Sequence, residues 1–230
     1  PRGKPSLLVE FGCGVGNSLV PLLELSDSLH CIGFDCSVKA ISLLLERWKK
    51  KLECRSTEES SIHKESTDFT CKLGELCPFN DDSNCTRLKG FTFDILESSI
   101  PHSICPKGLA DFGLLIFVLS AIHPESHQTV VSRCVESLAP GGIILFRDYG
   151  RYDMAQLRFA KSHKSKITDN FYVRYDGTFA YYFTVEEVES LFVNSGCKVL
   201  SNNYCLRQVV NRKTQVSMQR VWIQAKFVKK

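Results

Sequence analysis

The chain has 230 residues, of which 43% are hydrophobic and 23% are charged, and its net charge is +4. This length suits one α/β domain, and the absence of any run of 18 apolar residues argues against a transmembrane helix. The odd number of cysteines, 11, argues against a disulfide framework and favours a reducing compartment. We expect the cytoplasm, with the nucleus and the mitochondrion left open.

Residues 7–17 combine an apolar run with three closely spaced glycines. The apolar run shows no alternation, which predicts a strand buried on both faces of a parallel sheet. Gly12, Gly14 and Gly16 let the backbone turn sharply and approach a ligand closely. An amphipathic helix is predicted from Ser18, so the loop would place that ligand at a helix N-terminus. This arrangement indicates a nucleotide-like cofactor site.

Three carboxylates are spaced to face the same ligand. Glu10 precedes the glycines in the pattern E-x-G-x-G-x-G, which resembles the first motif of class I S-adenosylmethionine-dependent methyltransferases. Dinucleotide-binding proteins carry G-x-G-x-x-G instead. Asp35 ends a strand predicted at residues 29–35 and is placed to accept hydrogen bonds from a ribose. Asp94 ends a strand predicted at residues 91–94 and is expected either to reach an adenine amino group or to stabilise a turn.

Further elements alternate along the chain. The sequence predicts a helix at 38–51, capped by Ser37, and a strand at 110–122. A helix at 124–137 is expected to end at the Pro140-Gly141-Gly142 turn, which leads into a strand at 143–146. A helix that starts at a Thr184–Glu187 capping box and ends at residue 194 precedes a hairpin of residues 198–210 and 216–228. Residues 53–90 are polar and aperiodic, so we expect an irregular surface insertion. Its cysteines form no C-x-x-C pair, and no metal site is expected.

The order of these elements predicts the fold class. Strands alternate with helices, and glycine-rich or acidic loops follow the strands, which is typical of an α/β doubly wound, mostly parallel sheet with ligands at its carboxyl edge. The hairpin at the end of the chain is expected to close the sheet with antiparallel strands. We expect one domain over residues 1–230.

Residues 147–153, R-D-Y-G-R-Y-D, concentrate the side chains best suited to chemistry. They follow a strand that ends at the edge predicted for the glycine loop. Asp148 can accept a hydrogen bond from an exocyclic amine, and Tyr149 and Tyr152 can stack on a base. A charged turn with half-buried tyrosines is the alternative interpretation.

Basic and aromatic residues gather in the second half of the chain. Aromatic runs flank Asp176-Gly177, which predicts a hairpin, and their interleaving with arginine suits single-stranded nucleic acid as well as ordinary packing. Residues 206–230 contain basic residues and no acidic one. This charge indicates a polyanionic partner, although a solvated lysine-rich surface explains it equally well.

Long motifs extend over nearly the whole chain: E-F-G-C-G-V-G-N, I-F-V-L-S-A-I-H-P, L-A-P-G-G, R-D-Y-G-R-Y-D-M-A-Q-L-R-F, N-F-Y-V-R-x-D-G-T, V-N-R-K and R-V-W-I-Q-A-K-F. Together they resemble the methyltransferase-like tRNA 3-methylcytidine methyltransferases. The resemblance implies a seven-stranded class I fold, S-adenosyl-L-methionine as donor and S-adenosyl-L-homocysteine as product. The implied acceptor is N3 of cytidine 32 in a tRNA anticodon loop.

The resemblance also bears on partners and on the ends of the chain. It implies tRNA as the partner and no membrane contact, favours a monomer, and leaves open the need for an auxiliary protein such as an aminoacyl-tRNA synthetase. The family carries a region before its first motif. This chain starts at Pro1 close to that motif, so we expect an N-terminally trimmed chain.

Roles for individual residues follow from the resemblance. It implies that the cofactor is held by Glu10, Gly12, Gly14, Gly16, Asp35, Asp94, Ile95 and Ile116, with residues 120–122 on the methionine side. It places three residues in the catalytic base pocket: Asp148, Tyr149 and Tyr152. It places five residues on the substrate: Arg147, Arg151, Asp153, Arg158 and Arg174. Because N3 of cytosine carries a lone pair at neutral pH, in-line placement is the main task, and Asp148 is expected to stabilise the cationic product.

Two alternative functions remain open from the sequence. The first is a methyltransferase that uses the same donor on a small molecule or a protein. The second is a catalytically silent module that binds the cofactor or RNA. Salt-dependent binding of tRNA separates the favoured interpretation from the first alternative.

Overall fold

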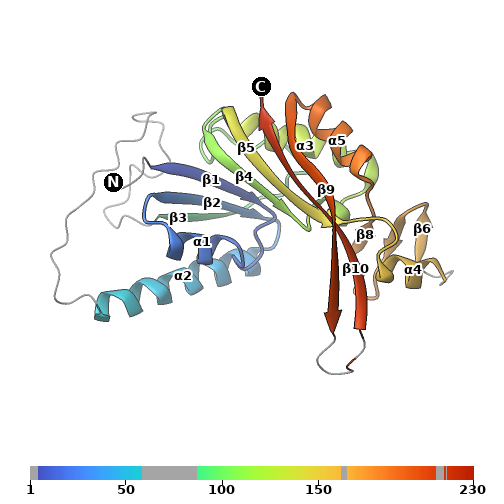
Figure 1. Cartoon of the computed structure of the whole chain (residues 1–230). Helices are drawn as coiled ribbons and strands as arrows, with labels where there is room; N and C mark the ends of the chain where they lie inside the picture. The colour runs from blue at the N-terminus through green and yellow to red at the C-terminus, as the bar shows by residue number, and fades with distance from the viewer. Residues whose placement is uncertain (1–4, 59–86, 162–164, 211–214, 216) are drawn as a thin grey trace.

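The computed structural model describes residues 5–58, 87–161, 165–210, 215 and 217–230. A seven-stranded sheet with the order β3-β2-β1-β4-β5-β10-β9 forms its centre (Figure 1). The parallel strands are β1 (Ser6–Phe11), β2 (Leu29–Asp35), β3 (Leu88–Thr92), β4 (Ala110–Ile116) and β5 (Leu138–Tyr149). β10 (Ser217–Lys229) runs antiparallel to both β5 and β9 (Cys197–Val210). The predicted α/β fold with an antiparallel hairpin is confirmed.

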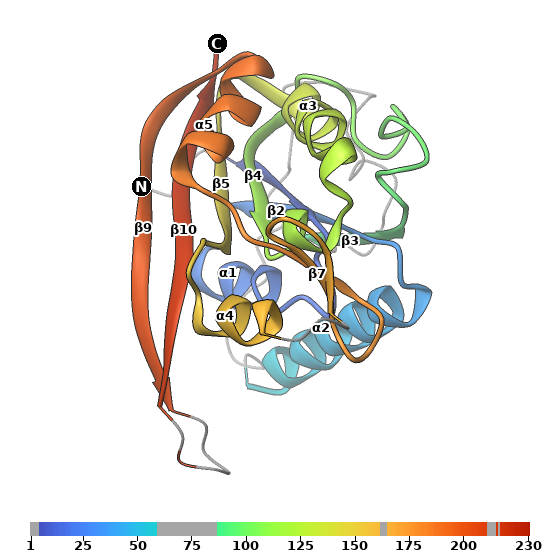
Figure 2. The same cartoon turned by 90° about the vertical axis from the view of Figure 1, so that its right-hand side faces the viewer.

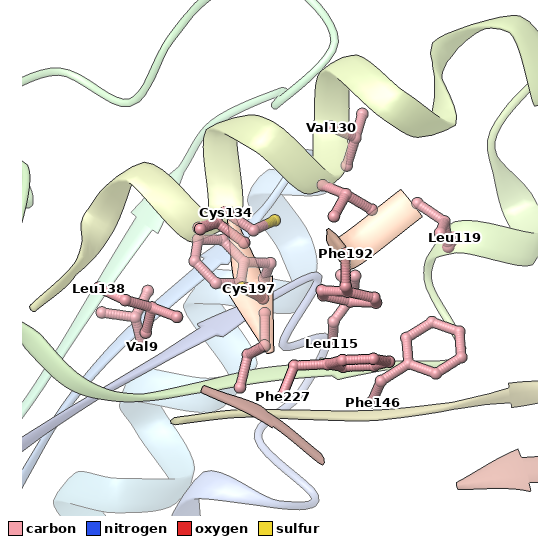
Figure 3. Packing of buried hydrophobic residues seen from close by; sticks show 14 of the residues in the cluster. Val9, Leu115, Leu119, Val130, Cys134, Leu138, Phe146, Phe192, Cys197 and Phe227 are labelled. Carbon is pink, nitrogen blue, oxygen red and sulfur yellow. The ribbon is translucent and has the colours of Figure 1, made fainter. Parts of the chain in front are cut away.

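Helices cover both faces of this sheet (Figure 2). α1 (Leu19–Leu25) and α2 (Val38–Glu58) pack on one face, and α3 (His127–Ser137) and α5 (Val185–Asn194) pack on the other. Successive strand residues point to opposite faces, so Leu8 joins the core under α1 while Val9 joins the core under α3. Figure 3 shows the second of these cores, in which the Phe192 and Phe227 rings stack with centroids 4.2 Å apart.

Side-chain caps fix the starts of two helices where the sequence predicts them. The Ser37 hydroxyl accepts a hydrogen bond from the backbone N–H of Ala40 at 3.2 Å, at the start of α2. At the start of α5, the Thr184 hydroxyl accepts from the N–H of Glu187, whose carboxylate in turn accepts from the N–H of Thr184. Both predicted caps are confirmed.

A smaller antiparallel sheet lies beside the end of β5. It contains β6 (Lys166–Thr168), β7 (Phe171–Val173) and β8 (Phe179–Tyr181), and α4 (Met154–Ala160) precedes it. The hairpin predicted at Asp176-Gly177 is confirmed, with Gly177 at φ +82°. α4 and β6 were not predicted. The N–H of Phe183 donates to the carbonyl of Tyr149 at 2.9 Å, which ties this sheet to the carboxyl end of β5.

Two predicted boundaries around the insertion are wrong. α2 continues to Glu58 instead of ending at residue 51. Its last turns contain helix-forming residues such as leucine, glutamate and arginine, which favour the longer helix. These turns show no apolar period, so the hydrophobic pattern did not predict them. β3 starts at Leu88, three residues before the predicted strand, because these residues pair with β2. Both ends of the insertion predicted at residues 53–90 therefore belong to other elements, residues 53–58 to α2 and residues 88–90 to β3. Residues 59–86 lie outside the described residues.

The strands at the centre of the sheet also differ from the prediction. β4 ends at Ile116 instead of residue 122, because Phe117 adopts φ +56° and a 3₁₀ helix, η2 (Leu119–Ala121), follows. β5 is longer than the predicted residues 143–146. It starts at Leu138, which pairs with Ala110, and reaches Tyr149. Residues 147–149 are therefore part of the strand and not of a loop. No helix within the described ranges is long and apolar enough to cross a membrane.

Candidate active site

The glycine loop between β1 and α1 forms one side of the site. Gly12, Gly14 and Gly16 adopt φ values of +70°, +52° and +76°, which side chains disfavour. A Cβ on Gly12 would lie 2.4 Å from Val118 Cγ2, and one on Gly16 would lie 2.2 Å from Leu44 Cδ1. Around Gly14, nothing lies within 4 Å of such a Cβ. The outer glycines are therefore needed for packing, whereas the Gly14 backbone faces open space that a ligand can occupy.

Two of the predicted carboxylates lie next to this loop. Asp35 accepts hydrogen bonds from the N–H groups of Gly14 at 2.8 Å and Ser37 at 2.9 Å, so it links the glycine loop to the start of α2. The carbonyl of Asp35 accepts from the N–H of Phe93, which brings Asp94 alongside. Asp94 accepts from the N–H of Leu96 at 2.8 Å and thus also serves as a turn aspartate.

The structure brings the other predicted cofactor residues to the same edge. Ile116 is the last residue of β4, and the carbonyl of Ile95 accepts a hydrogen bond from the Arg133 guanidinium. Both isoleucines are half-buried. They are therefore available to pack against a ligand that lies between the ends of β1, β3 and β4.

Glu10 is a buried carboxylate with spare bonding capacity. Its side chain is 3% exposed, and its Oε2 has no hydrogen-bond partner among the described residues. Burial raises the pKa of Glu10 to about 7, a hydrogen bond from Ser18 opposes this rise, and the charge of Asp35 adds to it. A cation that entered beside this oxygen would satisfy it. The site thus fits a cofactor that carries an ammonium and a sulfonium group.

The turn after β4 connects the glycine loop to β5. Phe117 donates its N–H to the carbonyl of Arg147 at 2.8 Å. The Phe117 ring packs against Tyr149 and Trp222, with centroid distances of 5.1 and 5.6 Å. The next residue, Val118, is the side chain that lies against Gly12. The predicted cofactor loop and the predicted base pocket are therefore in contact through two successive residues.

Asp148 lies beneath this turn. It has no exposed surface, and it accepts hydrogen bonds from the N–H groups of Ser120 at 2.9 Å and Tyr149 at 2.8 Å. Burial raises the pKa of Asp148 to about 6, while these hydrogen bonds and the charge of Arg174 oppose the rise. The sequence predicts that Asp148 contacts the acceptor base. The structure instead places it behind the surface of the site, where it holds η2 against β5.

Arginines and aromatic rings alternate around Tyr149. The guanidinium groups of Arg174 and Arg220 each lie 5.5 Å from the centre of the Tyr149 ring. Trp222 pairs with Tyr149 across β10 and β5, and Arg147 lies 5.1 Å from the centre of its ring. Sequence reasoning missed Arg220 and Trp222 as site residues. Their spacing of two on a strand, which puts both on one face, was the available signal.

Two predicted substrate-binding residues have structural partners instead. Asp153 is fully buried, caps α4 through the N–H of Ala155, and accepts from Arg220 Nε at 2.8 Å. Arg151 forms an ion pair with Glu187. Asp153 thus has internal partners for both of its carboxylate oxygens, and Arg151 has an internal partner for part of its guanidinium, so their contacts with a substrate stay predictions.

The remaining predicted residues stay accessible. Arg158 and Tyr152 are exposed on and before α4, and Tyr152 exposes 77% of its surface. Arg147 is half-buried and donates to the Gln224 side chain at 2.7 Å, and Arg174 is half-buried and donates to Thr178 at 3.1 Å. Their contacts with a substrate stay predictions.

Comparisons of sequence find related proteins over the whole chain. Residues 1–202 match the family described as "Methyltransferase domain". O-methyltransferase 3 of Dictyostelium discoideum is 35% identical over 99% of this chain and 45% of its own length. A tRNA N(3)-cytidine methyltransferase of Homo sapiens is 36% identical over 96% of this chain and 50% of its own, and one of Xenopus tropicalis is 38% identical over 96% and 56%. The chain spans about half the length of these relatives.

Solved structures share the fold at low sequence identity. A SAM-dependent methyltransferase from Methanosarcina mazei superposes with a TM-score of 0.62 at 12% identity, covering 99% of this chain and 93% of that chain. The 1,6-didemethyltoxoflavin-N1-methyltransferase of Burkholderia thailandensis, solved with 1,6-didemethyltoxoflavin and S-adenosylhomocysteine, has a TM-score of 0.57 at 14% identity, covering 99% and 72%. These similarities confirm the predicted fold class.

Proposed function

The chain belongs to the methyltransferase domain family, and we propose that it transfers a methyl group from S-adenosylmethionine to N3 of a cytidine in tRNA. The observation that carries this proposal is the turn at residues 117–118, in which Val118 contacts the glycine loop and Phe117 packs in an aromatic cluster with Tyr149 and Trp222. The choice of acceptor is supported by the relatives of Homo sapiens and Xenopus tropicalis, which are named tRNA N(3)-cytidine methyltransferases.

The residues around the glycine loop would hold the cofactor. Asp35 and Asp94 would face the adenosine part, and the open backbone at Gly14 would allow close approach. Glu10 would offer its unpaired oxygen to the cationic part. When bound, the cofactor supplies an electrophilic methyl group on a sulfonium. The half-buried Ile95 and Ile116 would exclude water from this side.

A cluster of aromatic rings would receive the base. Phe117, Tyr149 and Trp222 are half-buried and in contact with one another, and guanidinium groups lie over Tyr149 and Trp222. A cytosine ring would stack against this cluster of rings and arginines. Because N3 carries its own lone pair, no residue has to remove a proton before attack. Asp148 would act as a positioning residue, since it fixes the turn that carries Phe117 to the strand that carries Tyr149. Correct placement is the main source of rate enhancement in such a reaction.

One face of the hairpin supports a polyanionic substrate. Residues at alternate positions of β5, β10 and β9 point to the same side as Tyr149. The charged residues on this face are all basic: Arg147, Lys226, Lys198, Arg207 and Arg220, of which Arg220 forms an ion pair with Asp153. Figure 1 shows β9 and β10 continuing beyond the other strands, so the basic face extends away from the pocket. This placement suits a nucleic acid whose reactive base contacts the aromatic cluster.

A second candidate function is methylation of a small molecule. It is favoured by the relative from Dictyostelium discoideum, which is named O-methyltransferase 3 and matches 99% of this chain. A small acceptor does not need the basic face of the hairpin. The two candidates therefore differ in whether tRNA binds with a steep dependence on salt.

Nucleoside mass spectrometry tests the proposed function. The chain is incubated with S-adenosylmethionine and unmodified tRNA, and the digested tRNA is analysed for 3-methylcytidine. Formation of 3-methylcytidine is the expected result. If the chain binds S-adenosylmethionine in calorimetry but forms no 3-methylcytidine, another acceptor is indicated. If the chain binds no S-adenosylmethionine, the module is catalytically silent. The same assay with cytoplasmic extract added tests whether an auxiliary protein, such as an aminoacyl-tRNA synthetase, takes part.

A further inference from the structure

Tyr152 combines an unfavourable backbone conformation with an exposed ring. Its φ is +67°, a region that L-residues with large side chains rarely adopt. Its side chain is 77% exposed, so little burial offsets this strain. Strained residues that gain no packing tend to occur where function requires them.

Buried polar groups hold Tyr152 in this conformation. Gln156, 6% exposed, accepts a hydrogen bond from the N–H of Tyr152 at 2.6 Å. The same amide donates to Asn170 Oδ1 at 3.0 Å. Asn170 is itself left-handed, with φ +61°, and its carbonyl accepts from the N–H of Tyr182 at 3.0 Å. One buried amide thus connects two strained positions, one before α4 and one before β7.

The segment next to Tyr152 is attached to the aromatic cluster through Arg220. Asp153 accepts from Arg220 Nε, and the Arg220 guanidinium lies over the Tyr149 ring. The exposed Tyr152 therefore adjoins a residue that is bonded to Arg220, which lies on the basic face of the hairpin. An exposed aromatic ring in such a place suits stacking with an unpaired base, which tolerates any base because each has a π-face.

We propose that Tyr152 stacks on an unpaired nucleobase of the bound RNA and that Gln156 is a positioning residue that holds Tyr152 for this contact. The inference rests on the proposed function, since it needs an RNA substrate. It separates Tyr152, which the sequence predicts in the pocket of the methylated base, from the cluster of Phe117, Tyr149 and Trp222, and gives it a contact with another base. It also gives a reason for the strain at Tyr152.

Three substitutions test the role of Tyr152. Asn tolerates the left-handed region, so Tyr152→Asn removes the ring and most of the strain together. We expect its thermal midpoint to equal or exceed that of the wild type, while its Kd for unmodified tRNA rises on the order of tenfold. Tyr152→Phe keeps the ring and is expected to bind tRNA within about twofold of the wild type. Tyr175→Asn, at another fully exposed tyrosine, is the matched control and is expected to leave the Kd unchanged.

A double-mutant cycle tests the role of Gln156. Gln156→Met removes both hydrogen bonds and is expected to weaken tRNA binding as much as Tyr152→Asn does, with no further loss in the double variant. A purely structural role would give additive losses and would also lower S-adenosylhomocysteine affinity.

The outcomes separate this inference from the proposed function. A Tyr152→Asn variant that binds tRNA as tightly as the wild type, or whose thermal midpoint falls, overturns the inference alone. A wild-type chain that binds S-adenosylhomocysteine but no tRNA overturns the proposed function as well.

Discussion

The backbone N–H of Ser120 donates a hydrogen bond to Asp148 Oδ2 at 2.9 Å, and this bond joins the turn after β4 to the end of β5. Asp148 has no exposed surface, so the bond is shielded from water. Because Phe117 stands at the start of the same turn and Tyr149 follows Asp148, the bond sets the distance between the two rings. Its strength depends on the ionisation of Asp148, which gives the first prediction.

Activity is expected to fall below about pH 6, because burial raises the pKa of Asp148 from its usual 3.8 to about 6. Protonation weakens an acceptor that holds two N–H groups. Asp148→Asn should mimic this state, with methyl transfer at saturating S-adenosylmethionine reduced on the order of tenfold and nearly independent of pH between 5 and 8. Rates measured across this range check the prediction. Asp111→Asn is the matched control, because Asp111 accepts a hydrogen bond from the Leu7 N–H near the amino ends of β4 and β1, away from the site.

The stability contribution of Asp148 should change in the opposite direction. Its folded pKa lies above its unfolded value, so the folded state binds more protons between pH 4 and 6. The contribution of this group to the free energy of unfolding therefore rises as the pH falls through 6. A wild-type pH profile of activity identical to that of Asp148→Asn would contradict the proposed role.

Gly14→Ala and Gly12→Ala are expected to differ sharply. Alanine at Gly14 meets no atom within 4 Å, so the cost is the left-handed conformation alone, about 1 kcal/mol. Alanine at Gly12 also meets Val118 and should cost about 3 kcal/mol. Gly14→Ala should thus remain folded and still lose most of its S-adenosylmethionine affinity. Calorimetry and thermal melts check both effects, and unchanged cofactor affinity in folded Gly14→Ala would remove the loop from the cofactor site.

Cofactor binding is expected to release a proton near neutral pH. The pKa of Glu10 is about 7 without a neighbouring cation, and a bound ammonium would lower it. Calorimetry in two buffers with different ionisation enthalpies measures the released proton. Glu10→Gln is isosteric, should bind the cofactor more weakly and should release none.

The same substitution has a predictable effect on stability. The folded pKa of Glu10 exceeds its unfolded value of 4.5, so ionised Glu10 destabilises the folded state above pH 7 by about 3 kcal/mol. Glu10→Gln should therefore raise the thermal midpoint at pH 8 and change it little at pH 4. A lower midpoint at pH 8 would show that the carboxylate is paired after all.

Arg207→Ala is expected to weaken tRNA binding through charge alone. Arg207 is exposed on the basic face of the hairpin, opposite Arg220. Loss of one phosphate contact should reduce the slope of log K against log salt by about 1. Lys49→Ala removes an exposed cation from α2 and is the matched control. Equal salt slopes in the two variants would place the RNA elsewhere.

Much of the geometry around the glycine loop could be predicted from the sequence because its determinants are local. The glycine spacing, the carboxylate at Asp35 and the cap at Ser37 lie within a few residues of the elements that they shape. The same holds for the Thr184 capping box and the turn at Gly177. Short-range chemistry of this kind is readable without knowledge of the fold.

The acceptor side was harder to predict because its contacts join distant parts of the chain. Arg151 and Asp153 look like substrate-binding groups until their partners Glu187 and Arg220 are known. Trp222 reaches Tyr149 only through the register of β10. Neither strand pairing nor its register is fixed by a local pattern, so these partners could not be derived from spacing.

The position of β10 inside the sheet has a consequence for the order of assembly. The residues that contact the glycine loop, Asp35, Leu44 and Val118, are synthesised early in the chain. Arg220 and Trp222 of β10 are synthesised only after β9. On a ribosome, β5 would keep an open edge until residues 217–229 emerge. The newly made chain is thus expected to form its glycine loop first and the cluster around Trp222 last, which cofactor-binding assays on arrested nascent chains would measure.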